Sequence, residues 1–148
     1  MSSTKARYLL DLNALVALAD PDHQHHTPIQ TWFRGSGKED WGVCPLTEAG
    51  FIRVSTNPAY RPVSRTIAQA TAILADFRAA PGYSYWSMPD SWCALTAPFA
   101  ARVLGHQQVT DAYLLGLAVK HKGILVTFDK GIRYLAGAEF RRNLIVLE

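Results

Sequence analysis

The chain has 148 residues, 49% of them hydrophobic and 18% charged, with a formal net charge of +3. This length and composition predict one folded domain, 1–148, with a sizeable core, and they exclude a disordered chain. No apolar run reaches the roughly 20 residues that cross a bilayer, and no secretory signal precedes the first apolar run. Cys44 and Cys93 match no metal or redox motif. We therefore expect a cytoplasmic protein with reduced cysteines and no membrane association.

Short apolar runs alternate with helical patterns along the chain. In chain order we predict strand 7–10, helix 13–19, a helix around Trp32 and Phe33, strand 41–44, helix 46–54, helix 65–80 capped by Ser64, strand 83–86, helix 91–104 kinked or split at Pro98, helix 111–122, strand 124–128, a helical turn at 132–135 and strand 144–147. Alternating strands and helices predict an α/β/α sandwich with a mainly parallel central sheet.

The stretch at residues 109–129 is the most informative part of the sequence. Thr110 is a predicted N-cap, and Asp111 lies in the first turn of an almost wholly apolar helix. The predicted strand 124–128, which is rich in apolar residues, then ends at Asp129. Because ligands of open α/β sheets bind beyond the carboxyl ends of the strands, both carboxylates are expected to face one crevice.

The same arrangement recurs earlier in the chain. Asp11 follows the first predicted strand, and Glu48 opens the helix after the second. Each acid alone has an ordinary explanation as a helix cap or as a partner of the helix dipole. Four acids in equivalent places indicate a shared site. Without these four acids, the rest of the chain carries an excess of Lys and Arg, which suits a polyanionic substrate.

Converging carboxylates need a cation or protons. Two unit charges about 4 Å apart repel by about 4 kcal/mol at an effective dielectric constant near 20. An all-oxygen ligand set favours Mg²⁺ or Mn²⁺ over zinc. Such an ion activates water and neutralises charge on a phosphodiester, so a metal-dependent nuclease or phosphodiesterase is the chemistry that these residues support.

Three histidines fall in one polar loop, at His23, His25 and His26. They could bind a metal ion or simply be solvated. The cysteine spacing of structural zinc sites is missing and no regular element would gather the three rings, so we predict a solvated loop.

Several motifs resemble the PIN-domain ribonucleases, and within them the VapC-type toxins of bacterial toxin–antitoxin pairs. They are Tyr-Leu-Leu-Asp-Leu-Asn at 8–13, Leu-Thr-Glu at 46–48, Thr-Asp-Ala-Tyr-Leu-Leu-Gly-Leu-Ala at 110–118 and Val-Thr-Phe-Asp-Lys-Gly at 126–131, with supporting stretches at 20–26 and 48–58. The resemblance spans essentially the whole chain, in the family's order.

The resemblance implies a metal-binding quartet and a set of partners. The quartet would be Asp11, Glu48, Asp111 and Asp129, with Asn13 and Thr127 as supporting polar residues. It further implies Mg²⁺- or Mn²⁺-dependent cleavage of RNA, commonly tRNA or rRNA, a cognate antitoxin and a homodimer. From their proximity to the motifs, candidate phosphate contacts are Arg53, Arg61, Lys130 and Arg133.

Two other functions are compatible with these residues. A Mg²⁺-dependent phosphatase would use an aspartyl nucleophile, but residues 11–15 do not match its usual Asp-x-Asp-x-Thr pattern. A non-cleaving RNA-binding or interaction module could retain the metal site. It predicts RNA binding without strand scission.

Overall fold

The structure, a computed structural model, describes residues 6–60 and 64–148. Its elements in chain order are β1 (Tyr8–Leu10), α1 (Leu12–Ala19), α2 (His26–Gly35), η1 (Gly37–Glu39), β2 (Trp41–Gly42), α3 (Pro45–Ser55), α4 (Ile67–Ala79), α5 (Trp92–Thr96), η2 (Ala97–Arg102), η3 (His106–Gln108), α6 (Val109–Lys120), β3 (Ile124–Thr127), α7 (Ile132–Ala136), η4 (Arg141–Asn143) and β4 (Leu144–Val146).

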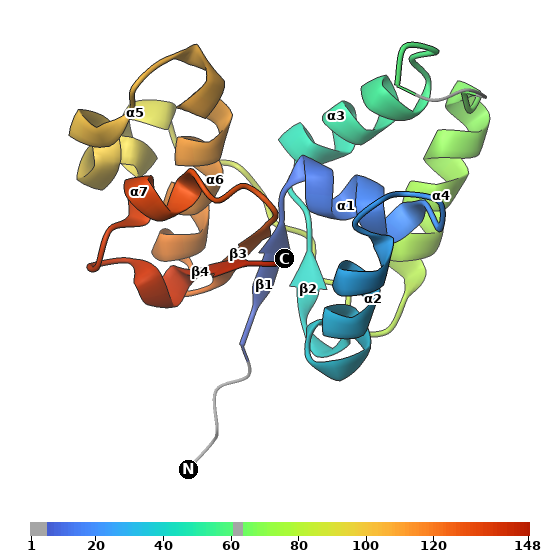
Figure 1. Ribbon diagram of the computed structural model, residues 1–148, viewed down its shortest axis with the longest axis horizontal. Coiled ribbons are helices and arrows are strands. Elements are labelled where there is room, and N and C mark those ends of the chain that lie inside the picture. Colours follow the sequence, from blue (N-terminus) through green and yellow to red (C-terminus); the bar gives the residue numbers. More distant parts are fainter. Residues whose placement is uncertain (1–5, 61–63) are drawn as a thin grey trace.

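The sheet is parallel throughout, with strand order β2-β1-β3-β4. Leu10 is paired with Val126, and Thr127 with Val146, so the carboxyl ends of β1, β3 and β4 lie side by side. Helices flank both faces of the sheet (Figure 1). The predicted α/β sandwich with a parallel sheet is confirmed.

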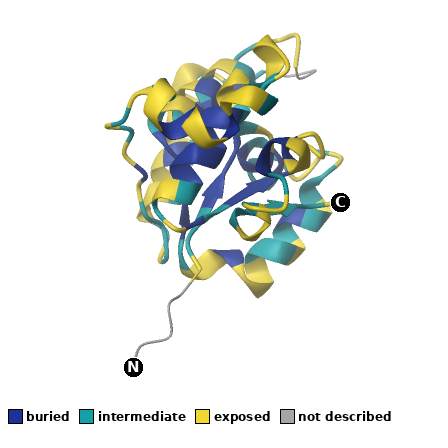
Figure 2. Cartoon of the chain, turned by 90° about the vertical axis from the view of Figure 1, so that its left-hand side faces the viewer, coloured by how far each residue is buried: buried dark blue, intermediate teal, exposed yellow. Residues whose placement is uncertain are grey.

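Alternate residues of the strands face two different cores. Leu9 and Leu125 pack with residues of α5, α6 and α7. Leu10 and Val126 pack with residues of α1, α2, α3 and α4. Figure 2 shows the buried strands enclosed by helices whose outer faces are exposed. Because each helical layer covers its own face of the sheet, the edge formed by the strand ends lies between the two layers.

The segment 83–86 is not the predicted strand. It runs beside β2, and the amides of Ser84 and Trp86 donate to the carbonyls of Trp41 and Val43, but only the Trp41–Tyr83 bridge forms. β2 is too short to extend the pairing, because Cys44 already caps α3.

Two predicted caps are also wrong. α4 begins two residues later than expected, with Thr66 as its N-cap in place of Ser64 and Gln69 completing a reciprocal capping box. α6 continues directly from η3, so Thr110 lies inside the helix instead of capping it.

Pro98 splits the predicted helix 91–104 into α5 and η2. In the part of the chain that the structure describes, no helix is long and apolar enough to cross a membrane.

Candidate active site

A cavity of about 350 Å³ lies at the carboxyl ends of β1 and β3. α1, α3 and α6 form its walls, and η3 contributes one residue. Its lining comprises Asp11, Leu12, Asn13, Leu46, Thr47, Ala49, Gly50, Arg53, Gln107, Thr110, Asp111, Leu114 and Asp129. Three of the four predicted acids therefore share one pocket.

Asp11 is held at the base of this pocket by both of its carboxylate oxygens. As the N-cap of α1, its Oδ1 accepts a hydrogen bond of 2.9 Å from the amide of Ala14. Its Oδ2 accepts a hydrogen bond of 2.5 Å from the hydroxyl of Thr127. Burial raises the pKa of Asp11 from 3.8 to about 6, although both hydrogen bonds act to lower it.

Thr127 connects Asp11 to Asp129. While its hydroxyl donates to Asp11, its Oγ1 accepts a hydrogen bond of 3.0 Å from the amide of Asp129. The Asp129 carboxylate accepts a further bond of 2.8 Å from the amide of Gly131. Thr127 is fully buried, so this hydroxyl fixes the relative position of the two acids.

Asp111 enters the pocket from the first turn of α6. Its pKa is raised from 3.8 to about 7, chiefly by burial and then by the negative charges of Asp11 and Asp129 and a hydrogen bond with Asp129. The Asp11 and Asp111 carboxyl groups thus retain protons to a higher pH than ordinary carboxyl groups do.

The donor set suits a hard cation but is not pre-assembled around one. Among residues 6–60 and 64–148, no three His, Cys, Asp or Glu side chains are close enough together to hold a metal ion. Asp11, Asp111 and Asp129 offer only oxygen, the ligand that Mg²⁺ and Mn²⁺ prefer. Mg²⁺ commonly retains several waters and few carboxylates, so a loose set of three acids fits it.

Glu48 does not line this pocket. Its Oε2 lies 3.8 Å from Nη1 of Arg78 on α4, and its side chain borders a separate groove between α3 and α4. Thr47 and Gly50, three residues apart on α3, form the face that meets the acidic pocket. Consecutive residues of an α-helix point in directions about 100° apart, so Glu48, next to Thr47, points toward α4 and away from the acidic pocket.

The other predicted residues are dispersed. Asn13 and Arg53 line the acidic pocket. Lys130 and Arg133 are exposed and lie 3.9 Å and 3.7 Å from Oε1 of Glu148. Arg61 falls outside the described residues.

Gln107 and Thr110 are pocket residues that the sequence did not identify. The sequence indicates Thr110 only as a helix cap, because it precedes an apolar helix. Gln107 is placed by the short turn η3, for which the sequence carries no clear signal.

The three histidines pack locally. His26 donates from Nδ1 to the carbonyl of Ala17 at 2.8 Å, and Nδ1 of His23 accepts from the amide of His25 at 3.0 Å. The ring of His25 stacks on Phe128 with centroids 4.4 Å apart. These contacts assign the histidines to the packing of the loop against α1 and the end of β3.

Fold and pocket together define an α/β protein with an acidic cleft at the carboxyl edge of a parallel sheet. Comparison with known proteins specifies the class further. The PIN domain family model matches residues 8–138. Ribonuclease VapC38 of Mycobacterium tuberculosis is 46% identical over 128 residues, covering 86% of this chain and 89% of its own length. Ribonuclease VapC39 of the same species is 39% identical, with coverage of 88% and 94%.

Solved structures show the same fold. One chain of FitAcB from Neisseria gonorrhoeae superposes with a TM-score of 0.56 at 17% identity, covering 87% of this chain and 92% of that chain. A chain of VapBC2 from Rickettsia felis superposes with a TM-score of 0.54 at 16% identity, with coverage of 94% and 96%. The chain belongs to the PIN domain family and, within it, to the VapC type.

Proposed function

We propose that this chain is a Mg²⁺- or Mn²⁺-dependent endoribonuclease and the toxin of a toxin–antitoxin pair. The observation that carries the proposal is the meeting of Asp11, Asp111 and Asp129 in one pocket at the carboxyl edge of the sheet. The relatives named ribonuclease VapC, at 46% and 39% identity, supply the substrate class.

The three aspartates would hold the ion. When bound, the ion would lower the pKa of a coordinated water and neutralise charge on the phosphodiester. Thr127 keeps the Asp11 carboxylate oriented through its hydroxyl, and Asn13 offers an amide at the rim of the pocket. Arg53 lines the same pocket and is the candidate contact for the phosphate that is cut.

The partners follow from the relatives. The solved chains of similar fold come from the two-component assemblies VapBC2 and FitAcB. We propose a cognate antitoxin that blocks this chain, a homodimer as its own assembly, and a cytoplasmic location. Copurification of the chain with the product of a neighbouring small gene would test the first of these.

Cleavage of total cellular RNA by the purified chain tests the enzymatic proposal. Reactions contain Mg²⁺, Mn²⁺ or EDTA, and Asp111→Asn is the matched variant because it preserves shape and removes one charge. We expect discrete fragments that require the metal and vanish in the variant. Calorimetric titration with Mn²⁺ reports metal binding separately. Cleavage that survives both EDTA and the substitution would contradict the assignment.

One observation favours a non-cleaving RNA-binding module as a second candidate. In the described residues the acids are not gathered into a ready-made group of three ligands. That module predicts RNA binding without scission under every metal condition.

A phosphatase is less compatible with the geometry, because both oxygens of Asp11 already accept hydrogen bonds. A covalent phosphoryl group on Asp11 would support it.

A further inference from the structure

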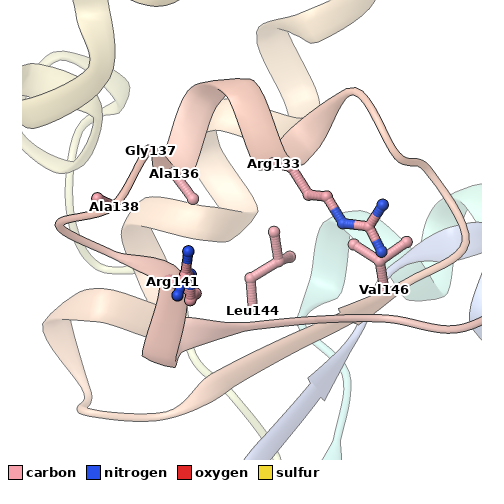
Figure 3. Close-up of a pocket in the computed structure, with 7 residues that line it drawn as sticks. All are labelled: Arg133, Ala136, Gly137, Ala138, Arg141, Leu144 and Val146. Atoms are coloured by element: carbon pink, nitrogen blue, oxygen red, sulfur yellow. The ribbon is translucent and has the colours of Figure 1, made fainter.

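A second cavity, of about 450 Å³, lies between α7 and β4 and shares no lining residue with the acidic pocket. Arg133 and Arg141 contribute its charged groups, and Leu144 and Val146 its apolar floor. Figure 3 shows the two arginine side chains at opposite ends of the cavity, with Leu144 between them. The cavity thus combines a short apolar surface with a cation at each end.

The roof of the cavity is kept open by small residues. Ala136, Gly137 and Ala138 line it. Gly137 has φ +59°, and a Cβ there would lie 2.9 Å from Nη1 of Arg102. The same nitrogen of Arg102 donates to the carbonyls of Leu135 and Ala136 at the end of α7. This turn is therefore fixed by the fold and is not free to collapse into the cavity.

The cavity adjoins the acidic site along the same edge of the sheet. Val146 is paired with Thr127, whose hydroxyl donates to Asp11. Neighbouring strands are about 4.8 Å apart, so the floor of the cavity begins one strand away from Thr127 and two strands away from the end of β1, where Asp11 lies. Arg133, in α7, follows Asp129 by four residues. The path from the acidic pocket to this cavity therefore follows the carboxyl edge of the sheet.

The charges near the cavity favour a polyanion. Four cationic residues lie within 130–142, namely Lys130, Arg133, Arg141 and Arg142, and the only acid in that stretch is Glu139. Within the described residues Arg141 has no ion pair, while Arg133 and Lys130 share exposed Glu148 at 3.7 Å and 3.9 Å. Exposed pairs of this kind are weak, so a phosphate can displace Glu148 from Arg133.

We infer that this cavity binds one nucleotide of an RNA strand whose neighbouring phosphodiester lies at the acidic pocket. Arg133 and Arg141 contact the phosphates on either side, and the base lies against Leu144 and Val146. Guanidinium planes and apolar side chains suit an unpaired base, so the ligand is single-stranded RNA. The inference rests on the proposed ribonuclease function, because it assigns a subsite for that substrate.

Binding of a fluorescein-labelled single-stranded RNA of mixed sequence tests the subsite. Fluorescence anisotropy is measured in EDTA, so that cleavage contributes nothing. Arg141→Glu is compared with Arg142→Glu, a neighbour in η4 that is exposed and lies outside the cavity. We expect Arg141→Glu to weaken binding about tenfold or more through loss of a charge-assisted contact, and Arg142→Glu to weaken it far less.

A second measurement locates the nucleotide. Adenosine 5′-monophosphate is added to methyl-labelled protein, and the NMR signals of Leu144 and of Leu114, which lines the acidic pocket, are compared. We expect Leu144 to shift more, and its shift to diminish in Arg141→Gln. The milder substitution keeps the test valid if Arg141→Glu disturbs folding, as judged by circular dichroism.

The outcomes separate this inference from the proposed function. Equal weakening in Arg141→Glu and Arg142→Glu, or a shift confined to Leu114, overturns the subsite even if metal-dependent cleavage persists. No RNA binding by the unsubstituted chain also overturns it. Loss of the metal requirement for cleavage overturns the proposed metal site while leaving the anisotropy comparison interpretable.

Discussion

Thr127 is the single residue on which the geometry of the acidic pocket depends most. Its hydroxyl donates to Asp11 and accepts from the amide of Asp129. Thr127→Val keeps the shape and removes both bonds, so we expect the free energy of unfolding to fall by about 1–3 kcal/mol. Cleavage should fall with it, because the Asp11 carboxylate loses its orientation. Urea denaturation measures the first effect.

Thr127→Ser is the control for this change, because it retains the hydroxyl. It should restore most of the cleavage that Thr127→Val loses. If the valine variant cleaves RNA as well as the unsubstituted chain, the hydroxyl has no role in the site.

The acids also predict how stability depends on pH. Folding raises the pKa values of Asp11 to about 6 and of Asp111 to about 7, from 3.8. Between these limits the folded chain binds more protons than the unfolded chain, so stability decreases as pH rises from about 4 to about 7. Thermal unfolding in EDTA should show this loss, and it should be smaller in Asp111→Asn.

Mg²⁺ is expected to reverse that loss at pH 8, because it replaces the protons as the partner of the carboxylates. A metal-free stability that rises over this pH range would contradict the shifts.

Glu48 provides a test of which acids belong to the site. It faces Arg78 and lines another groove, whereas Asp129 lines the acidic pocket. We therefore expect Asp129→Asn to abolish cleavage and Glu48→Gln to change it by no more than about fivefold, the effect of losing a partly exposed ion pair. Equal loss in both variants, with Mn²⁺ affinity reduced in both, would return Glu48 to the metal site.

At the scale of elements, α6 is positioned by its contact with α5. A Cβ on Gly116 would lie 2.4 Å from the backbone oxygen of Leu95. Gly116→Ala should therefore lower stability, by roughly 1–3 kcal/mol as for other overpacked sites, despite the better helix propensity of alanine. Cleavage should fall as well, because α6 carries Asp111.

Gly35→Ala is the matched control, because nothing lies within 4 Å of its added Cβ. It should leave the midpoint of thermal unfolding unchanged or raise it. A neutral Gly116→Ala would show that α5 can move away from α6 without cost.

The main elements were predictable because their signals are local. The apolar run at β3 and the apolar helix α6 are recognisable by composition, and both are buried. Asp11 and Asp129 could be placed together because the carboxyl ends of parallel strands coincide.

Two things could not be predicted from the sequence: which way a side chain points around its helix axis, and whether one element runs on into the next. A first-turn acid such as Glu48 can face either side of its helix, and only packing of α3 against α1 and α4 decides which. Thr110 resembles a cap until η3 is seen to continue into α6. The segment 83–86 has strand composition, but it lacks a partner strand of sufficient length.

At the scale of the whole molecule, we expect the charge distribution to govern binding of the proposed RNA substrate. The net charge is +3, although three carboxylates meet in the acidic pocket. We expect the affinity for single-stranded RNA to fall with added NaCl, linearly on logarithmic axes. The slope should be shallower by about one in Arg141→Glu, because a phosphate contact is lost. Affinity independent of salt would contradict phosphate recognition.

Asp11 has two structural roles that Asp111 does not have. It caps α1 through the amide of Ala14 and satisfies the buried hydroxyl of Thr127, whereas Asp111 extends into the pocket from a helix that needs no side-chain cap from it. Loss of a helix cap costs about 1 kcal/mol, so inactive Asp11 variants are also weakened proteins. In growing cells, a selection for harmless alleles would recover Asp111 changes as abundant intact protein and Asp11 changes as protein depleted by proteases. The abundance of each surviving allele would thus distinguish residues that only act from residues that also hold the fold together.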